Sequence, residues 1–348
     1  MSKRTISSAH PSSTRARARV AVIVPAYGVA HLVGEALESL QAQTMAHWEC
    51  VVVDDGAPDD VAGAVAPFQA DSRITLLQTD NAGVSTARNR AIARTTAPFV
   101  ALLDGDDILR PDYLAEACSA LEGDEDARLV TVNARIFGAV RQERNCFSTR
   151  QGKGDGEHGT LADVLDRSFG VYIGSTFRRA DFDAVGGFDS SMTHAEDFDL
   201  WVRLMLLGGH ALYIDKVLGD YRVRGASASA SELKMLKGNI RTFEKALEVL
   251  PADAPEADIA RAMIEANARE LRFALAADRV ISGDRGALAD LKTNAGPGLG
   301  HLWRLYFTLW SLVPALAAPM LAIRRRRNAR GAGVPEAESR DDRQAVPA

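Results

Sequence analysis

The sequence predicts an α/β fold in which a mostly parallel sheet is flanked by helices and followed by a helical C-terminal extension. Within residues 20–103, four short apolar runs alternate with segments of helical periodicity, the pattern of parallel strands joined by right-handed crossovers. Clusters of polar residues follow these runs, and from residue 231 to about residue 280 the pattern is helical. With 348 residues, 47% of them hydrophobic, the chain can form one large domain and an appendage.

Each element of this alternation has its own sequence signal. The first strand, Val20–Val24, is rich in β-branched residues and stops at Pro25. We expect further strands at Trp48–Val53, Arg73–Leu77 and Phe99–Leu103, separated by helices at Ala30–Gln43, Asp59–Ala66 and Val84–Arg94. Downstream we expect a helix at Pro111–Leu121, a strand at Arg128–Phe137, a mobile glycine-rich loop at Gly138–Thr160, a helical turn at Arg179–Val185, a helix at Ala195–Leu207, and short strands at Ala211–Ile214 and Val217–Tyr221.

Composition limits the classes of partner and the compartment. The net charge of −5 gives no overall electrostatic support for nucleic acid binding, so no nucleic-acid partner is expected. The cysteines, Cys50, Cys118 and Cys146, are odd in number and widely spaced, which favours neither a disulfide framework nor a zinc site and fits a reducing cytoplasm. Residues 1–18 are rich in Ser, Arg and Ala and lack the apolar core of a secretory signal. We expect them to be a disordered basic arm.

The C-terminal region contains a candidate membrane segment. Leu305–Ile323 has 19 residues without a charge and is followed by four arginines, Arg324–Arg327, a length sufficient to cross a bilayer. Pro314 and Pro319 argue against a straight helical span. The arginines do so too, because a single span starting from a cytoplasmic domain would place them outside the cytoplasm, against the positive-inside tendency. We therefore expect a kinked interfacial or re-entrant segment whose arginines meet anionic headgroups on the cytoplasmic face of the membrane. The alternative is a helix docked on the core or on a partner subunit.

These boundaries divide the chain into five parts. After the arm come an α/β domain at 19–228, a helical extension at 229–300 that is interrupted near Pro251–Pro255, and a hydrophobic and basic membrane-associating segment at 301–328. Within that segment, residues 302–327 would make the peripheral membrane contact. Residues 329–348 are polar and expected to be a disordered tail.

Polar residues gather where the alternation places the carboxyl edge of the sheet, the edge at which such folds bind ligands. The clusters are Pro25-Ala26-Tyr27, Asp54-Asp55-Gly56, Asn81-Ala82-Gly83 with Arg88-Asn89, and Asp104–Asp107. An acid-rich rim with a nearby arginine suits a divalent cation and a diphosphate, because carboxylates hold the cation and the guanidinium faces phosphate oxygens. The phosphate-binding motifs GxxxxGK[ST] and, after the first strand, GxGxxG are absent, which disfavours P-loop nucleotides and dinucleotides.

Six ordered motifs give the sequence a resemblance to a known family. They begin at Val20 (VAVIVPAY), Val53 (VDDG), Asn81 (NAGVSTARN), Leu103 (LDGDD), Gly186 (GGFD) and Glu196 (EDFDLW). Together they resemble the family 2 glycosyltransferases, which have the Rossmann-like GT-A fold and use nucleotide-sugars. The resemblance covers about residues 19–224 and fades beyond them.

The resemblance implies roles for individual residues. Pro25, Tyr27 and Asp55 would line the nucleotide pocket, and Arg88 would lie near the base or the diphosphate. Asp104 and Asp106 would form the DxD element, with Asp106 as the direct ligand of Mn²⁺ or Mg²⁺, Asp104 at the ribose or a metal-bound water, and Asp107 as an alternative ligand. Asp197 would be the general base of an inverting, single-displacement transfer. On the acceptor side or in auxiliary roles we place Glu196, Trp201, Arg222 and Arg224; the two arginines stand where the family commonly has a basic residue or a histidine.

The expected activity is therefore transfer of a sugar from a nucleotide-diphosphate sugar, by resemblance a UDP-sugar, to a glycan or lipid-linked acceptor in envelope or exopolysaccharide synthesis. Three alternatives are weighed against it. The run Gly83–Ala87 approaches the GxSxG elbow of a serine hydrolase, but polar residues separate it from the strand. A nucleotidyltransferase of similar fold would have a glycine-rich basic loop after the first strand, and a relative that only binds the nucleotide-sugar would show no transfer.

Overall fold

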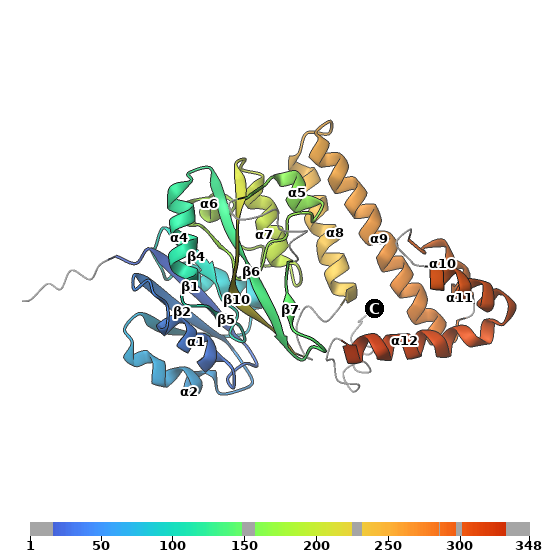
Figure 1. The fold of residues 1–348 in the computed structure, drawn as a ribbon, viewed down its shortest axis with the longest axis horizontal. Helices are drawn as coiled ribbons and strands as arrows, with labels where there is room; N and C mark the ends of the chain where they lie inside the picture. The colour runs from blue at the N-terminus through green and yellow to red at the C-terminus, as the bar shows by residue number, and fades with distance from the viewer. Residues whose placement is uncertain (1–16, 148–156, 225–231, 285, 297–300, 332–348) are drawn as a thin grey trace, which may run out of the picture.

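A mixed sheet organises the first two-thirds of the molecule (Figure 1). The structure, a computed structural model, describes residues 17–147, 157–224, 232–284, 286–296 and 301–331. The ten strands in this part of the chain have the order β3-β2-β1-β4-β9-β6-β10-β5, with β7 paired to β6 and β8 to β10. Their bounds are β1 Val20–Ala26, β2 Trp48–Asp55, β3 Ile74–Thr79, β4 Phe99–Leu102, β5 Ile108–Leu109, β6 Ala127–Gly138, β7 Arg144–Asn145, β8 Glu157–Gly159, β9 Thr176–Arg178 and β10 His210–Val223.

The parallel half of the sheet confirms the predicted alternation. Strands β1 to β4 are parallel, with β1 between β2 and β4. β1 continues past its predicted end through Pro25, which pairs with Val53 of β2. β4 pairs with β1 only as far as Ile23. At Pro25 no strand on that side needs the backbone N–H that proline lacks, so proline is tolerated at this position. The carboxyl ends of β1, β2 and β4 therefore meet at one rim.

The other half of the sheet corrects one expectation. The two short strands predicted between Ala211 and Tyr221 form one strand, β10, of 14 residues, whose pairing with β6 shifts register between Ile214 and Val217 and again before Gly219. The bulge places Asp215 and Lys216 in exposed positions, and this polar interruption of the apolar pattern is what suggested two strands. The loop predicted at Gly138–Thr160 contains β7 and β8; its residues 148–156 lie outside the described part of the chain.

Helices cover both faces of the sheet, with a hydrophobic core on each side. On one face lie α1 (Val33–Gln41), α2 (Val61–Val65) with the 3₁₀ turn η1 (Ala66–Ala70), and α4 (Tyr113–Gly123). On the other face lie α3 (Val84–Ile92), α5 (Leu161–Leu165), α6 (Arg179–Ala184) and α7 (Glu196–Met205). Helix α8 (Glu232–Val249) and the first part of α9 (Pro255–Ile281) add Phe243, Ala246 and Ala260 to this second core.

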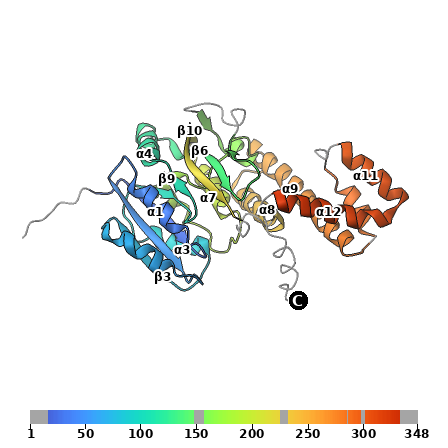
Figure 2. The same cartoon turned by 60° about the horizontal axis from the view of Figure 1, so that its bottom comes forward.

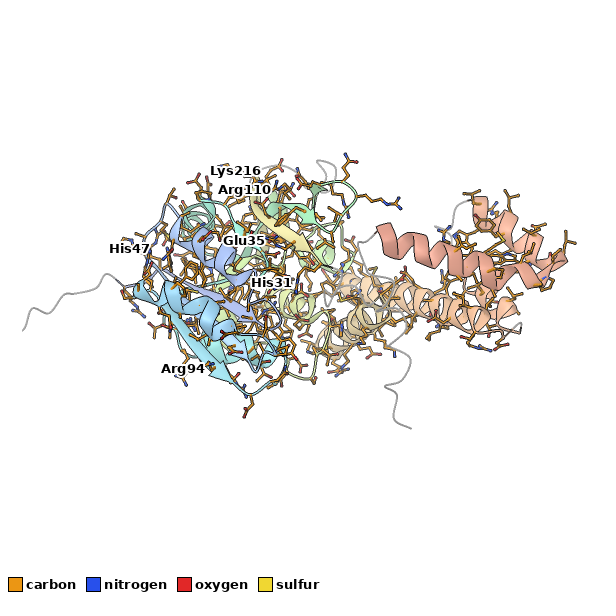
Figure 3. All side chains as sticks on the ribbon, turned by 90° about the horizontal axis from the view of Figure 1, so that it is seen from below. His31, Glu35, His47, Arg94, Arg110 and Lys216 are labelled. Atoms are coloured by element: carbon orange, nitrogen blue, oxygen red, sulfur yellow. The ribbon has the colours of Figure 1, made fainter. Side chains whose placement is uncertain are left out.

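The remaining helices extend away from the sheet (Figures 2 and 3). The end of α9 packs with α10 (Ala287–Thr293), α11 (His301–Leu312) and α12 (Ala317–Gly331) around a third core that contains Trp303 and Trp310. A short 3₁₀ turn, η3 (Pro314–Leu316), separates α11 from α12, so the apolar segment is kinked at Pro314 as expected. In the described ranges, no helix combines the length and hydrophobicity needed to cross a membrane. The predicted arm and tail fall almost entirely on residues 1–16 and 332–348, which are not described.

Candidate active site

The turn after β4 forms the centre of the carboxyl rim. The N–H of Asp107 donates to the carbonyl of Asp104 at 2.9 Å, which closes the turn. Gly105 packs against the end of β1, where a Cβ would lie only 3.1 Å from the carbonyl oxygen of Pro25. A side chain at position 105 would push the turn away from β1, so glycine keeps the turn that carries Asp104 and Asp106 close to the end of β1.

Arg88 joins the turn to the start of α7. Its guanidinium is 2% exposed and donates from Nη2 to Asp104 Oδ1 at 2.7 Å and from Nη1 to Glu196 Oε1 at 2.8 Å. Burial disfavours the charged guanidinium, but Asp104 and Glu196 outweigh that effect and raise the pKa of Arg88. Arg88 is therefore a permanent cation that ties the predicted DxD element to the predicted general-base motif.

Asp106 and Asp107 have different surroundings although they are neighbours. Asp107 is 2% exposed, and its oxygens accept from the N–H of Arg222 (2.7 Å) and the hydroxyl of Tyr172 (3.3 Å). Burial and the nearby Asp104 raise its pKa well above the usual range. Asp106 is less buried and forms an ion pair with Arg224. Burial, with repulsion from Asp104, raises its pKa as well.

The donor set at this turn fits a divalent cation. Asp104 and Asp106 provide hard carboxylate oxygens, the ligands that Mg²⁺ and Mn²⁺ prefer. Their mutual repulsion is what a cation would relieve, since a nearby positive charge favours ionised carboxylates. Asp107 has both oxygens engaged within the protein, which makes it a poorer candidate than Asp106.

Asp197 lies in the first turn of α7. The residue before the helix, Ala195, has φ = +58°, a left-handed conformation that is uncommon for a residue with a side chain. Asp197 is partly exposed and accepts from the N–H of Phe198 at 2.7 Å. Desolvation and the neighbouring Glu196 raise the pKa of Asp197 to about 6, despite Arg88 and Arg167. This carboxylate is ionised at neutral pH and is a stronger base than an ordinary aspartate.

The residues predicted to line the nucleotide pocket lie on the same rim. The side chain of Asp59 accepts from the N–H groups of Gly28 and Ala30, and the loop that it orders leaves Tyr27 53% exposed. Asp55 is 4% exposed and accepts from the hydroxyl of Thr79 and the N–H groups of two residues in the turn 81–83. Asp55 thus orders the turn that leads into α3, the helix of Arg88.

Two residues singled out in the sequence are core residues. Trp201 is 1% exposed and packs edge-on against Phe177 with ring centroids 5.7 Å apart. Of the two roles predicted for Trp201, acceptor-side or auxiliary, burial corrects the first: a buried ring cannot touch an acceptor, although it can support α7. Ser85, the serine of the hydrolase-like run, is 3% exposed and donates to the carbonyl of Met192, which leaves it unsuited to nucleophilic attack.

Arg222 and Arg224 both reach the Asp104–Asp107 turn from the end of β10. Arg222 donates from Nε to the carbonyl of Asp106 at 2.8 Å and from Nη2 to Glu35 of α1 at 2.6 Å; Glu35 is labelled in Figure 3. Arg224 pairs with the Asp106 side chain. The two predicted arginines thus belong to the same rim as the DxD element and provide positive charge beside it.

An ion network behind α7 was not anticipated from the sequence. Lys245 of α8 pairs with Asp189 at 2.7 Å and with Asp199 at 2.5 Å, and Arg203 bonds to the other Asp199 oxygen. Asp199 is 1% exposed. Asp189 and Asp199 are part of two recognised motifs, but Lys245 lies beyond them in a helix with no motif. The N-terminal part of α7, which presents Asp197, is thereby fixed to α8.

The chain is similar to known glycosyltransferases. Residues 21–186 match the family model described as "Glycosyl transferase family 2". Among curated proteins, an Escherichia coli protein named UDP-Glc:alpha-D-GlcNAc-diphosphoundecaprenol beta-1,3-glucosyltransferase is 28% identical over 225 residues, which cover 63% of this chain and 82% of that protein. Several other curated relatives are much longer, and the chain spans between 16% and 31% of their length.

Solved structures share the fold at lower identity. Staphylococcus aureus TarS, residues 1–349 in complex with UDP-GlcNAc, has a TM-score of 0.59 and 18% identity, covering 90% of this chain and 89% of that chain. The mannosyltransferase PcManGT from Pyrobaculum calidifontis, in complex with GDP-Man and Mn²⁺, has a TM-score of 0.57 and 23% identity, covering 87% of this chain and 86% of that chain. The mixed sheet with its flanking helices is the GT-A fold, as predicted.

Proposed function

Since the chain belongs to glycosyltransferase family 2, we propose that it transfers a sugar from a nucleotide-diphosphate sugar to a hydroxyl group of a glycan or lipid-linked acceptor in polysaccharide synthesis. The observation that carries this proposal is the bridge through Arg88, which holds Asp104 and Glu196 in one cluster beside Asp197. The donor end and the acceptor end of a transfer reaction would meet at this cluster. A UDP-sugar is the first donor to test, because one curated relative is named for UDP-Glc.

The donor would lie on the rim between β1 and the Asp104–Asp107 turn. Asp106, with Asp104 beside it, would hold Mn²⁺ or Mg²⁺, and the cation would neutralise charge on the leaving diphosphate. Arg222 and Arg224 supply further positive charge at the same place. A structural relative was solved with GDP-Man and Mn²⁺, which supports a divalent cation as the cofactor.

Asp197 would act as the general base. The acceptor oxygen forms a bond to the anomeric carbon as the bond from that carbon to the diphosphate oxygen breaks, and the hydroxyl proton passes to Asp197. Because attack comes from the face opposite the leaving group, the configuration at the anomeric carbon inverts. The raised pKa of about 6 suits this role, since the carboxylate is ionised at pH 7 yet more basic than an ordinary aspartate.

The acceptor is proposed to be lipid-linked and the protein to contact a membrane surface through residues 302–327. One curated relative is named for a diphosphoundecaprenol-linked sugar. In this chain, α11 exposes Leu302, Leu305, Leu309 and Leu312 along one side, a spacing that places them on one helix face. A cavity of about 440 Å³ beside them is lined by Trp303, Tyr306, Trp310 and other residues of the two C-terminal helices, together with Arg141 and Arg324. Apolar side chains next to guanidinium groups suit a bilayer interface carrying anionic headgroups.

The function is tested by substitution of Asp197. We expect Asp197→Asn to lower the rate of sugar transfer by about 10²–10⁴-fold, the range for loss of a general base, while binding of the nucleotide-sugar is retained. Activity of the unsubstituted enzyme should fall as the pH decreases below about 6, because protonation removes the base. The measurements are nucleotide release in a donor screen and donor binding by calorimetry. Asp258→Asn, at a carboxylate with an 80% exposed side chain on α9, is the control. Donor binding without release in the unsubstituted protein, with any acceptor, would favour a non-catalytic binder.

The metal assignment is tested by comparing two neighbouring substitutions. Asp106→Asn should raise the Mn²⁺ concentration needed for half-maximal release by about tenfold or more, because it removes a charged ligand. Asp107→Asn should leave that concentration nearly unchanged, since an amide can still accept from the N–H of Arg222. EDTA should abolish release and Mn²⁺ or Mg²⁺ should restore it. Nucleotide release that is unaffected by EDTA would contradict a metal cofactor. If Asp107→Asn raises the required Mn²⁺ concentration and Asp106→Asn does not, Asp107 is the metal ligand.

A further inference from the structure

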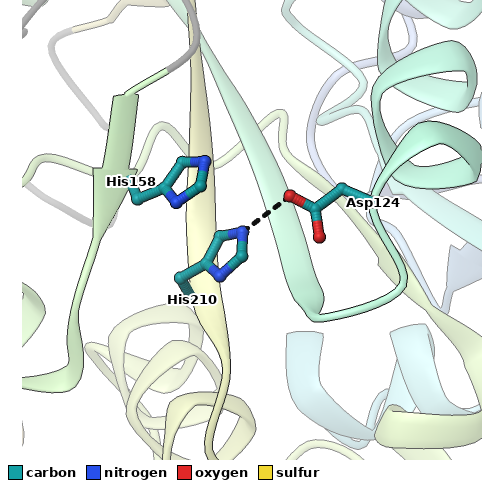
Figure 4. A group of neighbouring side chains, drawn as sticks. All are labelled: Asp124, His158 and His210. Carbon is teal, nitrogen blue, oxygen red and sulfur yellow. Dashed lines mark hydrogen bonds and ion pairs between the residues drawn. The ribbon is translucent and has the colours of Figure 1, made fainter.

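A second cluster of metal-binding side chains lies far from the donor rim. Asp124, His158 and His210 have ligand atoms that all lie within 4.8 Å of one another (Figure 4). His210 begins β10, whereas Arg222 of the rim stands 12 residues further along the same strand, roughly 40 Å at about 3.3 Å per residue. The cluster is therefore separate from the proposed Mn²⁺ or Mg²⁺ site.

The backbone holds the three side chains together from three segments. Asp124 follows α4 directly, and its side chain is fixed by the N–H of Asp126 at 3.1 Å. His210 Nε2 lies 2.8 Å from Asp124 Oδ2. His158 comes from β8, where it pairs with Leu212. The side chains of residues 210 and 212 share a face of β10, so His158 and His210 are diagonal neighbours across the two strands.

The two imidazole rings are stacked rather than spread apart. Their centroids are 3.9 Å apart and their planes differ by 5°. Figure 4 shows the two rings one above the other, with Asp124 reaching His210 from the right. With metal–nitrogen distances near 2.0–2.1 Å, two ligands of a tetrahedral ion stand about 3.3 Å apart. Because a cation lies in the plane of each imidazole that binds it, two parallel stacked rings cannot bind one ion as they stand. His158 is exposed, so its ring can turn out of the stack and direct a nitrogen atom at an ion bound to His210 and Asp124.

From this geometry we infer that Asp124, His158 and His210 form a structural site for a zinc-type divalent cation. Two imidazoles and one carboxylate are the ligand set of borderline ions such as Zn²⁺, whereas Mg²⁺ prefers oxygen ligands alone. The cation would replace the proton shared by His210 and Asp124 and take water in the remaining position. It would fasten the three-residue strand β8 to β10 and to the end of α4.

The test is a titration of the full chain with Zn²⁺, after removal of any affinity tag and with millimolar Mg²⁺ present to occupy the oxygen-ligand site. We expect one tightly bound Zn²⁺ per chain, and a visible absorption band typical of tetrahedral coordination when Co²⁺ is used instead. His158→Ala should weaken Zn²⁺ binding at least tenfold and abolish the Co²⁺ band. Since His158 is exposed, this variant should fold and keep its transferase activity. Zn²⁺ should raise the midpoint of thermal unfolding of the unsubstituted protein by more than that of the variant.

Matched variants decide the outcome. His31→Ala removes an exposed histidine elsewhere on the domain, labelled in Figure 3, and should bind Zn²⁺ like the unsubstituted chain. Asp124→Asn should weaken binding while keeping an acceptor for the N–H of Asp126. If His158→Ala and His31→Ala bind Zn²⁺ equally well, or if the unsubstituted chain binds no Zn²⁺ in the presence of Mg²⁺, the inference is overturned. Neither result would bear on the proposed transferase function.

Discussion

The sheet domain buries nearly all of its large apolar side chains, whereas the C-terminal helices expose many of theirs. Among the described residues, the domain at 17–224 exposes two of them, Tyr27 and Leu207, whereas residues 301–323 expose seven, from Leu309 at 37% to Leu312 at 77%. A globular domain hides such side chains in its core, and a contiguous exposed set points to a surface that meets something else. The domain is thus built around its own core and rim, and the terminal helices around an outer apolar face.

Helix α8 does not follow this division. It lies after the predicted domain boundary at residue 228, yet Phe243 and Ala246 are buried in the same core as α7. Lys245 reaches Asp189 and Asp199. The difference between the two regions therefore begins after α8 and the first part of α9. Substitutions of packed or ion-paired residues in α8 should lower the free energy of unfolding of the domain, and substitutions on the exposed face of α11 should not.

The largest effect on stability is expected for Lys245→Met. Asp199 is 1% exposed and would keep Arg203 but lose the ammonium group, while Asp189 would lose its cation. Hydrogen bonds to charged groups contribute about 1.5–3 kcal/mol each, and Lys245 makes two of them. We therefore expect a loss of at least about 3 kcal/mol in the free energy of unfolding. Urea unfolding followed by circular dichroism measures it. The rate of transfer should fall too, because the same network fixes the N-terminal part of α7.

The control for this prediction is Arg241→Met on the same helix. Arg241 is 51% exposed and pairs with Glu244 and Glu248, and exposed pairs of this kind contribute about 0–1 kcal/mol. If the Lys245 and Arg241 variants unfold at the same urea concentration, the Lys245 network does not join α8 to the domain core. The predicted domain boundary at residue 228 would then be kept.

A smaller effect is expected for Gly238→Ala, which tests whether α8 positions Asp197, the proposed general base. A Cβ at this position would lie 2.4 Å from the carbonyl oxygen of His194 and 3.0 Å from Cβ of Ala195. The residues before α7 would have to move, at a cost of about 1–3 kcal/mol, partly offset by the better helix propensity of alanine. Because Ala195 precedes Glu196 and Asp197, we expect about a tenfold lower kcat with a nearly unchanged KM for the donor.

Gly123→Ala provides the comparison, since no atom outside the adjoining backbone of α4 lies within 4 Å of the added Cβ. It should leave kcat unchanged. A Gly238 variant with full kcat would show that the left-handed conformation of Ala195 tolerates displacement and does not position Asp197.

The sequence predicted the parallel half of the sheet well because each element there carries a local signal. Apolar runs ending in Asp-Gly marked β2 and β4, and the motifs indicated Arg88, Asp106 and Asp197. What local patterns could not supply are pairings between distant segments. Lys245 lies 46 residues beyond Asp199, and Tyr172 lies 65 residues beyond Asp107. The sequence left the role of Trp201 open between acceptor contact and support for the same reason: its position in a motif is visible, while its burial depends on packing against β9.

The smallest effect on stability, and the sharpest test of the outer apolar face, is expected for the double substitution Leu305→Ser and Leu312→Ser. These side chains are 65% and 77% exposed, so the free energy of unfolding should change by no more than about 0.5 kcal/mol. Binding to vesicles with anionic lipids should nevertheless weaken about tenfold, because two leucines that would insert at the interface are removed. Sedimentation with vesicles measures it. Val249→Ser, at an equally exposed position on α8 (69%), should leave vesicle binding unchanged. If all three proteins bind vesicles equally, the exposed leucines do not face a membrane, and the contrast between the two regions has another cause, such as a partner subunit covering α11.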